Sequence, residues 1–257
     1  MSRLRSVVFL ALSAISLGAA AQKFSLGLKA GVLGVYTNFP DSSDTMKTAI
    51  KPGFSAAGFI SFPLKKNYSF QAEGGFSQQG RSYKYGPNGD KWSGTYQFVD
   101  LAMTLRKNFK LRIKKDIATN WFVNVGPNIN YWLSGTGSLI PYIGIHQHYA
   151  LALDASPGPM YTKIYVTNIN RWLYGLNIGI GFSAVTRKNQ KIVTEIRLTW
   201  GQTYLGRRDS EYVNGVAGIR NELNLKSNLK VLNLSVGYVL DRDIQKSRMG
   251  KSTKKIK

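Results

Sequence analysis

A strict two-residue alternation of side chains constrains this chain more than any other feature. In "WLYGLNIGIGFSAV", residues 172–185, the even positions hold Trp, Tyr, Leu, Ile, Ile, Phe and Ala, and most odd positions hold Gly, Asn or Ser. A period of two places the two sets on opposite faces of a strand, whereas a helix would mix them. The same pattern recurs in "KFSLGLKAGV", "GFSAAGFISF", "YSFQAEGGFSQQG", "VDLAMTLR", "WFVNVGPNINYWL", "KIVTEIRLTW" and "VLNLSVGYVL". The sequence therefore predicts an all-β chain.

The lengths of these segments and of their connections favour a barrel in a membrane. Segments of about ten residues with dyad alternation are typical of transmembrane β-strands. Connections after the second, fourth and sixth segments are short, and the others are longer. Outer-membrane barrels have short periplasmic turns and longer extracellular loops. We predict a transmembrane antiparallel up-and-down β-barrel of eight strands over residues 22–240, with its apolar face toward outer-membrane lipid and its polar face lining a filled lumen.

Two alternative architectures remain open at this stage. The stretches "IPYIGIHQHYALAL" and "MYTKIYVTNIN", between residues 134 and 170, both look like strands. They form either a hairpin above the membrane or two more wall strands, which would make ten. A soluble, lipocalin-like barrel that binds apolar ligands would instead turn the apolar face inward. The five tryptophans, at 92, 121, 132, 172 and 200, lie near strand ends, as interfacial girdles or as core aromatics.

The N-terminus predicts export. Arg3 and Arg5 precede the apolar run "VVFLALSAISLGAA", and "AAA" at 19–21 is a small-residue cleavage pattern. These features indicate a signal peptide over residues 1–21. The run is shorter than the ~20 residues that a spanning helix needs. The formal net charge is +22. Because an exported chain seldom meets nucleic acid, we expect no nucleic-acid partner and a location in the outer membrane of a Gram-negative bacterium.

Basic residues concentrate in the short turns and in a tail over residues 241–257, which together would face the periplasm. The predicted periplasmic basic surface comprises Lys107, Lys110, Arg112, Lys114, Lys115, Arg187 and Lys188. One interpretation is a solvated rim beside anionic phospholipid headgroups. The other is a docking surface for an acidic periplasmic or secretion-machinery protein, because a clustered charge attracts a partner of opposite sign.

Charged residues also occur on the face that would line the lumen. They are Lys29, Glu73, Asp100, Arg106, Glu195 and Arg197. An unpaired charge inside a narrow barrel is costly, so the mixture of signs predicts a cross-lumen network of paired charges. Such a network favours a plugged interior over a conducting pore. We expect none of these groups to be catalytic.

The sequence offers little that suggests enzymatic or metal chemistry. The absence of cysteine excludes disulfides and thiolate metal sites. His146 and His148 would share a strand face as a metal pair, or lie in an extracellular extension. With Ser138 nearby, they also allow a lipid A-modifying barrel enzyme as an alternative. We expect no enzyme, no metal and no cofactor.

Three stretches carry a resemblance to a known family. "FSLGLKAGV" resembles the opening strand of the PorT family of outer-membrane β-barrel proteins, and "FQAEGGFSQQG" is similar to its strand with an inward acidic residue before Ser-Gln-x-Gly. "YQFVDLAMTLRKNF" resembles the family's Tyr-x-Glu-Ile-Pro-Leu-Leu-Leu-Lys stretch, with Asp100 in place of the usual Glu and Ala102 in place of Pro. The resemblance implies a barrel of about eight strands. It further implies an accessory or structural role in protein secretion across the outer membrane.

Overall fold

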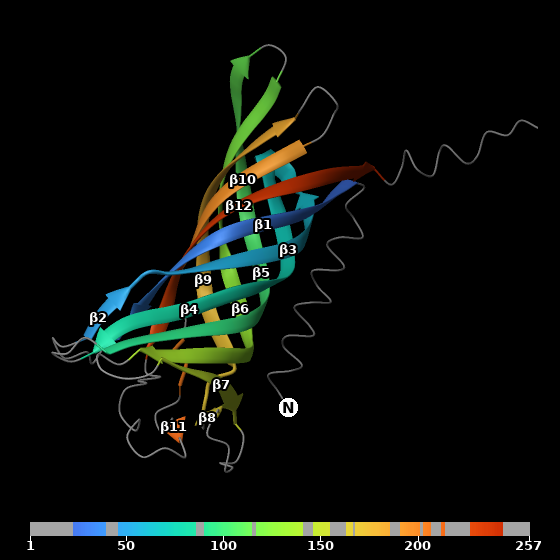
Figure 1. The fold of residues 1–257 in the computed structure, drawn as a ribbon. Coiled ribbons are helices and arrows are strands. Elements are labelled where there is room, and N and C mark those ends of the chain that lie inside the picture. Colours follow the sequence, from blue (N-terminus) through green and yellow to red (C-terminus); the bar gives the residue numbers. More distant parts are fainter. Residues whose placement is uncertain are drawn as a thin grey trace, which may run out of the picture.

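The chain forms a closed antiparallel barrel of eight strands (Figure 1). The computed structural model describes residues 23–39, 46–85, 90–114, 117–140, 146–154, 163–166, 168–185, 191–200, 203–206, 212–213 and 227–243. The wall strands are β1 (Lys23–Asn38), β3 (Lys51–Pro63), β4 (Tyr68–Tyr85), β5 (Asp90–Lys114), β6 (Ile117–Ile140), β9 (Trp172–Val185), β10 (Lys191–Trp200) and β12 (Asn228–Asp243). Each strand pairs with the next, and β12 pairs with β1 to close the wall. The predicted eight-stranded barrel is confirmed.

The ten-stranded alternative is wrong, because β6 pairs directly with β9. The two stretches between them extend the sheet beyond the wall as β7 (Gln147–Leu153) and β8 (Lys163–Val166). β7 pairs antiparallel with the end of β6, and β8 runs parallel to β7. The two stretches therefore do not form the hairpin with each other that the sequence suggested.

The barrel has two unlike ends. At one end β3 and β4 are joined through the 3-10 turn η1 (Lys65–Asn67), while residues 115–116 join β5 to β6 and residues 186–190 join β9 to β10. We call this the short-turn end; it is uppermost in Figure 1. At the opposite, long-loop end lie β7, β8, β2 (Met46–Ala49) and β11 (Tyr212–Val213). The predicted alternation of short and long connections thus sorts them between the two ends.

Alternation along each strand separates the two faces as predicted. On β9 the even residues from Trp172 to Phe182 are exposed on the outside, whereas Asn177 and Ser183 are buried inside. On β1, Leu28 is 73% exposed on the outer face. The interpretation as a soluble binder with its apolar face inward is therefore wrong. No helix in the described residues is long and apolar enough to cross a membrane.

The ladder between β5 and β6 is interrupted at three places. It skips Met103 and Thr104 of β5, opposite Gly126 and Pro127 of β6. Proline has no backbone N–H to donate to a neighbouring strand. Two register shifts lie between Gln97 and Phe98 and between Arg112 and Lys114. All three irregularities occur in the longest hairpin of the wall, which projects beyond the other strands at the short-turn end (Figure 1).

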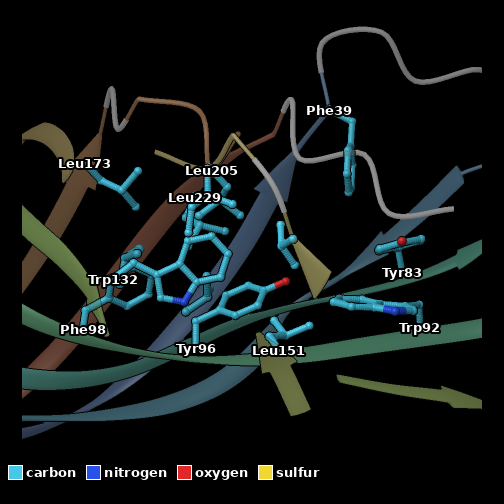
Figure 2. Packing of buried hydrophobic residues seen from close by; sticks show 14 of the residues in the cluster. Phe39, Tyr83, Trp92, Tyr96, Phe98, Trp132, Leu151, Leu173, Leu205 and Leu229 are labelled. Atoms are coloured by element: carbon cyan, nitrogen blue, oxygen red, sulfur yellow. The ribbon is translucent and has the colours of Figure 1, made fainter. Parts of the chain in front are cut away.

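An aromatic cluster fills the interior at the long-loop end (Figure 2). Trp132 is fully buried there, with ring centroids 4.9 Å from Tyr96 and 6.2 Å from Phe98. Trp92 is also buried and stacks on Tyr83 at 5.4 Å. Of the two interpretations of the tryptophans, the core-aromatic one holds for Trp92 and Trp132, because both fall on the lumen side of their strands.

The outer face carries the other three tryptophans. Trp172 and Trp200 are exposed there, and Trp121 is half-buried and stacks on Phe109 at 4.2 Å between ring centroids. Trp121 lies near the short-turn end, whereas Trp172 and Trp200 lie near the long-loop end. These three residues are placed as interfacial girdles require.

Candidate functional site

Charged side chains from four strands meet at mid-height in the lumen. Glu73 of β4 accepts two hydrogen bonds from the guanidinium of Arg197 on β10, at 2.6 and 2.7 Å. Lys29 of β1 lies 2.6 Å from Glu73 and 3.5 Å from Glu195. Arg197 also donates to Glu195 at 2.7 Å, and Arg106 of β5 lies 4.0 Å from the same carboxylate. Five of the six predicted lumen charges therefore lie within ion-pair distance of one another.

The sixth charge, Asp100, lies at the edge of this group. It accepts a hydrogen bond from the amide of Asn130, which in turn accepts one from Asn128 at 2.5 Å. No ion pair joins Asp100 to another described residue. Its partner Asn130 is a neutral side chain, which the charge pattern of the sequence did not single out.

Neutral amides complete the network. Gln71 donates to Glu73 at 2.6 Å, and Asn124 donates to Glu195 at 2.8 Å. Both amides face the lumen. Gln71 is two residues from Glu73 on β4, and Asn124 of β6 stands opposite Arg106 of β5. The alternation therefore placed them on the correct face, but it gave no sign of which carboxylate each would reach.

The interior is layered along the barrel axis. A cavity of about 70 Å³ lies beside Glu73, Asp100 and Arg197, which is room for a few water molecules. The aromatic cluster covers the network on the long-loop side. On the short-turn side lies an apolar ring made of Phe59, Phe122, Val193 and Val239. The guanidinium of Arg106 sits 3.8 Å from the centre of the Phe122 ring, at the junction of the network and this ring.

Arg81 of β4 is a further buried cation, which the sequence analysis missed. It is fully buried, and its guanidinium lies 4.7 Å from the ring centre of Trp92 and 5.8 Å from that of Tyr96. It also donates to Ser227 at 3.1 Å. Arg81 falls on the same face of β4 as Glu73, so the alternation could have identified it as a lumen residue.

A family match agrees with this architecture. Residues 20–205 match the family described as outer membrane protein beta-barrel domain. The chain belongs to this family. It is an outer-membrane protein of a Gram-negative bacterium, and its apolar outer face contacts membrane lipid. No curated protein matches the chain.

Several solved outer-membrane barrels are similar to this chain at low sequence identity. OprG from Pseudomonas aeruginosa superposes with a TM-score of 0.50 at 10% identity, covering 86% of this chain and 96% of OprG. NspA, a neisserial surface protein, gives 0.38 at 12% identity, with coverage of 84% and 96%. Ail, the attachment invasion locus protein of Yersinia pestis, gives 0.33 at 10% identity, with coverage of 84% and 99%.

The predicted basic surface residues do not all lie on the same face of the barrel wall. Lys107 lies on the outer face, with its ammonium 5.3 Å from the ring centre of Tyr68 and 5.5 Å from that of Phe109. Lys110 is exposed on the lumen side of the same strand, at the short-turn mouth. Arg112 and Lys114 lie in the projecting end of β5.

Other predictions fall outside the described residues. Lys115, Arg187, Lys188, the signal peptide over 1–21 and residues 244–257 of the basic tail all lie there. β12 itself continues to Asp243, three residues beyond the predicted barrel end at 240. The first three residues of the predicted tail thus belong to the last strand.

The candidate enzymatic residues lie beyond the wall at the long-loop end. The rings of His146 and His148 are 4.4 Å apart, and His148 stands opposite Ser138 in the β6–β7 ladder. The Ser138 hydroxyl donates to the carbonyl of Ser93 at 3.5 Å. Among the described residues, no three His, Cys, Asp or Glu side chains gather as a metal site.

Proposed function

We propose that this outer-membrane barrel is a non-enzymatic, non-conducting accessory of protein secretion of the PorT type. In this proposal its short-turn end faces the periplasm and docks an acidic protein of the secretion machinery. The observation that carries it is the filled lumen, because a barrel whose interior is occupied works through its surfaces. The three stretches that resemble the PorT family support the link to secretion.

The contents of the lumen argue against solute passage. Porins leave an aqueous channel, whereas an eight-stranded barrel is narrow enough for side chains to fill. Here the aromatic cluster, the paired charges and the apolar ring follow one another along the axis. A hydrated ion would have to break the ion pairs of Glu73 and then cross two apolar layers.

The charge of the short-turn end favours an acidic partner. Short turns face the periplasm in outer-membrane barrels. Lys107 and Lys110 are exposed at this end, and the sequence places Arg112, Lys114 and Lys115 in the same hairpin. Arg187, Lys188 and the tail over 241–257 add further cations to the same side. A cluster of one sign attracts a partner of the opposite sign and accelerates its association.

A pair of matched variants tests the docking function. One variant replaces Lys107, Lys110, Arg112, Lys114 and Lys115 by Gln and lacks residues 244–257. The control replaces five exposed lysines of the long-loop end, Lys47, Lys84, Lys91, Lys163 and Lys230. Cross-linking in cells followed by mass spectrometry should recover an acidic periplasmic protein with the wild type and the control only. Recovery of the same protein with the first variant would overturn the docking function.

Planar-bilayer recordings test the filled lumen separately. The purified barrel should produce no stable single-channel steps. Reproducible steps that disappear when the protein is left out would overturn the non-conducting assignment. Cell fractionation and the mobility of boiled and unboiled samples on gels confirm that each preparation is a folded outer-membrane barrel.

A further inference from the structure

We propose that the short-turn mouth of the barrel is a binding cup for the carboxylate side chains of an acidic protein segment from the periplasm. The proposal rests on the proposed function, since it names the part of the docking surface that recognises the partner. The cup lies inside the ring of strands, between the apolar ring and the tips of the short turns.

The walls of the cup are cationic and rich in hydrogen-bond donors. Its cavity has a volume of about 310 Å³, and residues from every wall strand line it. Its lining includes the cations Arg106, Lys110 and Lys191 together with hydroxyl and amide groups such as those of Ser61, Asn108 and Asn120. None of the described residues that line it is acidic. This chemistry is complementary to carboxylate oxygens, which accept hydrogen bonds and carry negative charge.

Arg106 at the floor of the cup has unused hydrogen-bonding capacity. Its side chain is only 9% exposed, and its Nε–H finds no acceptor among the described residues. Its nearest carboxylate, on Glu195, is 4.0 Å away, which is too long for a hydrogen bond. A guanidinium has five N–H donors in a planar fork that matches a carboxylate. The centre of the Phe122 ring lies 3.8 Å from this guanidinium, so the ring contact orients the group before any ligand arrives.

The position of the cup favours a protein segment over a lipid headgroup. Phospholipid headgroups surround the outside of the wall, where Lys107 and Tyr68 face them. The cup opens along the barrel axis instead, so an occupant enters from the periplasm. Its volume admits a few side chains and excludes a folded domain. The cations of the projecting β5–β6 hairpin would attract a negatively charged chain toward this opening.

Binding of a synthetic acidic peptide tests the cup directly. The probe is fluorescently labelled hexaglutamate, measured by anisotropy with the full mature barrel in zwitterionic detergent; labelled hexaglutamine is the uncharged control. Wild type should bind hexaglutamate and not hexaglutamine. Arg106→Gln should weaken binding about tenfold, the loss expected for one charge-assisted hydrogen-bonded pair. Lys110→Gln with Lys191→Gln should weaken it about threefold to tenfold. Lys47→Gln with Lys230→Gln, at the opposite end, should leave it unchanged.

The following outcomes would overturn the proposal that this cavity binds carboxylates. Equal binding by wild type and the Lys110/Lys191 variant would do so even if Arg106→Gln fails to fold, which gel mobility before and after boiling reveals. Displacement of the peptide by inorganic phosphate at the same concentration as free hexaglutamate would show a simple anion site instead. If the Lys110/Lys191 variant still captures the periplasmic partner while the five-residue basic variant does not, the cup is wrong and the docking function stands. Capture by both variants would overturn both.

Discussion

Replacement of Glu73 by Gln tests whether the lumen charges stabilise the barrel as a paired network. Glu73→Gln keeps the shape of the side chain and removes its charge. The carboxylate is 5% exposed, contacts Lys29 at 2.6 Å and accepts two hydrogen bonds from Arg197. The variant therefore leaves three cations in the network against the single carboxylate of Glu195. Removing one partner of a buried ion pair costs about 3–5 kcal/mol. We expect a loss of that size in the free energy of unfolding.

Urea unfolding of the barrel in lipid vesicles, followed by tryptophan fluorescence, measures this loss. Asp154→Asn is the matched control, because Asp154 is 46% exposed and its ion pair with Arg171 is 3.4 Å long. Exposed pairs contribute about 0–1 kcal/mol, so the control should change little. The double variant Lys29→Met with Glu73→Gln should recover part of the loss, since it removes a cation together with the carboxylate. A loss below about 1 kcal/mol for Glu73→Gln would refute the paired network.

Two further substitutions test the close packing of the wall and its lipid-facing side. At Gly126, an added Cβ would lie 1.9 Å from the carbonyl oxygen of Met103, whereas at Gly58 its nearest neighbour would be 3.7 Å away. Gly126→Ala should therefore destabilise the barrel by about 1–3 kcal/mol or prevent its assembly, and Gly58→Ala should be tolerated. If the two variants show the same shift in gel mobility on boiling and the same unfolding midpoint, the prediction is wrong. Leu28→Arg places a charge on the outer face beside the mid-height residue Lys29, and should cost about 2–4 kcal/mol of unfolding free energy in a bilayer. A change below about 0.5 kcal/mol would mean that this face does not meet the hydrocarbon core.

The sequence predicted the faces of the strands better than the contacts across the lumen. Alternation alone placed Lys29, Glu73 and Arg197 inside, because side-chain direction in a strand depends only on the parity of the position. It could not give their separations, which depend on how far each strand is shifted along its neighbour. The bidentate contact between Glu73 and Arg197 joins residues 124 apart in sequence.

Predictions that ignored parity failed in instructive places. The place of Trp92 and Trp132 near strand ends left the girdle interpretation open, yet both are at even positions on strands whose even residues face inward. Arg81 was overlooked although its odd position matches that of Glu73 on β4. For these residues the register of the strand, and not the residue type, carried the information. The parallel pairing of β7 and β8 had no such local signal.

The sequence by itself determined the all-β class, which residues share a face of each strand, and the alternation of short and long connections. These follow from local periodicity, composition and spacing, which act over a few residues. Only the tertiary structure decided which lumen charges pair, that Arg106 stands between the network and a cationic cup, and that β6 closes directly on β9. These depend on the register of pairing around a closed wall, where a shift of one strand changes every contact across the lumen.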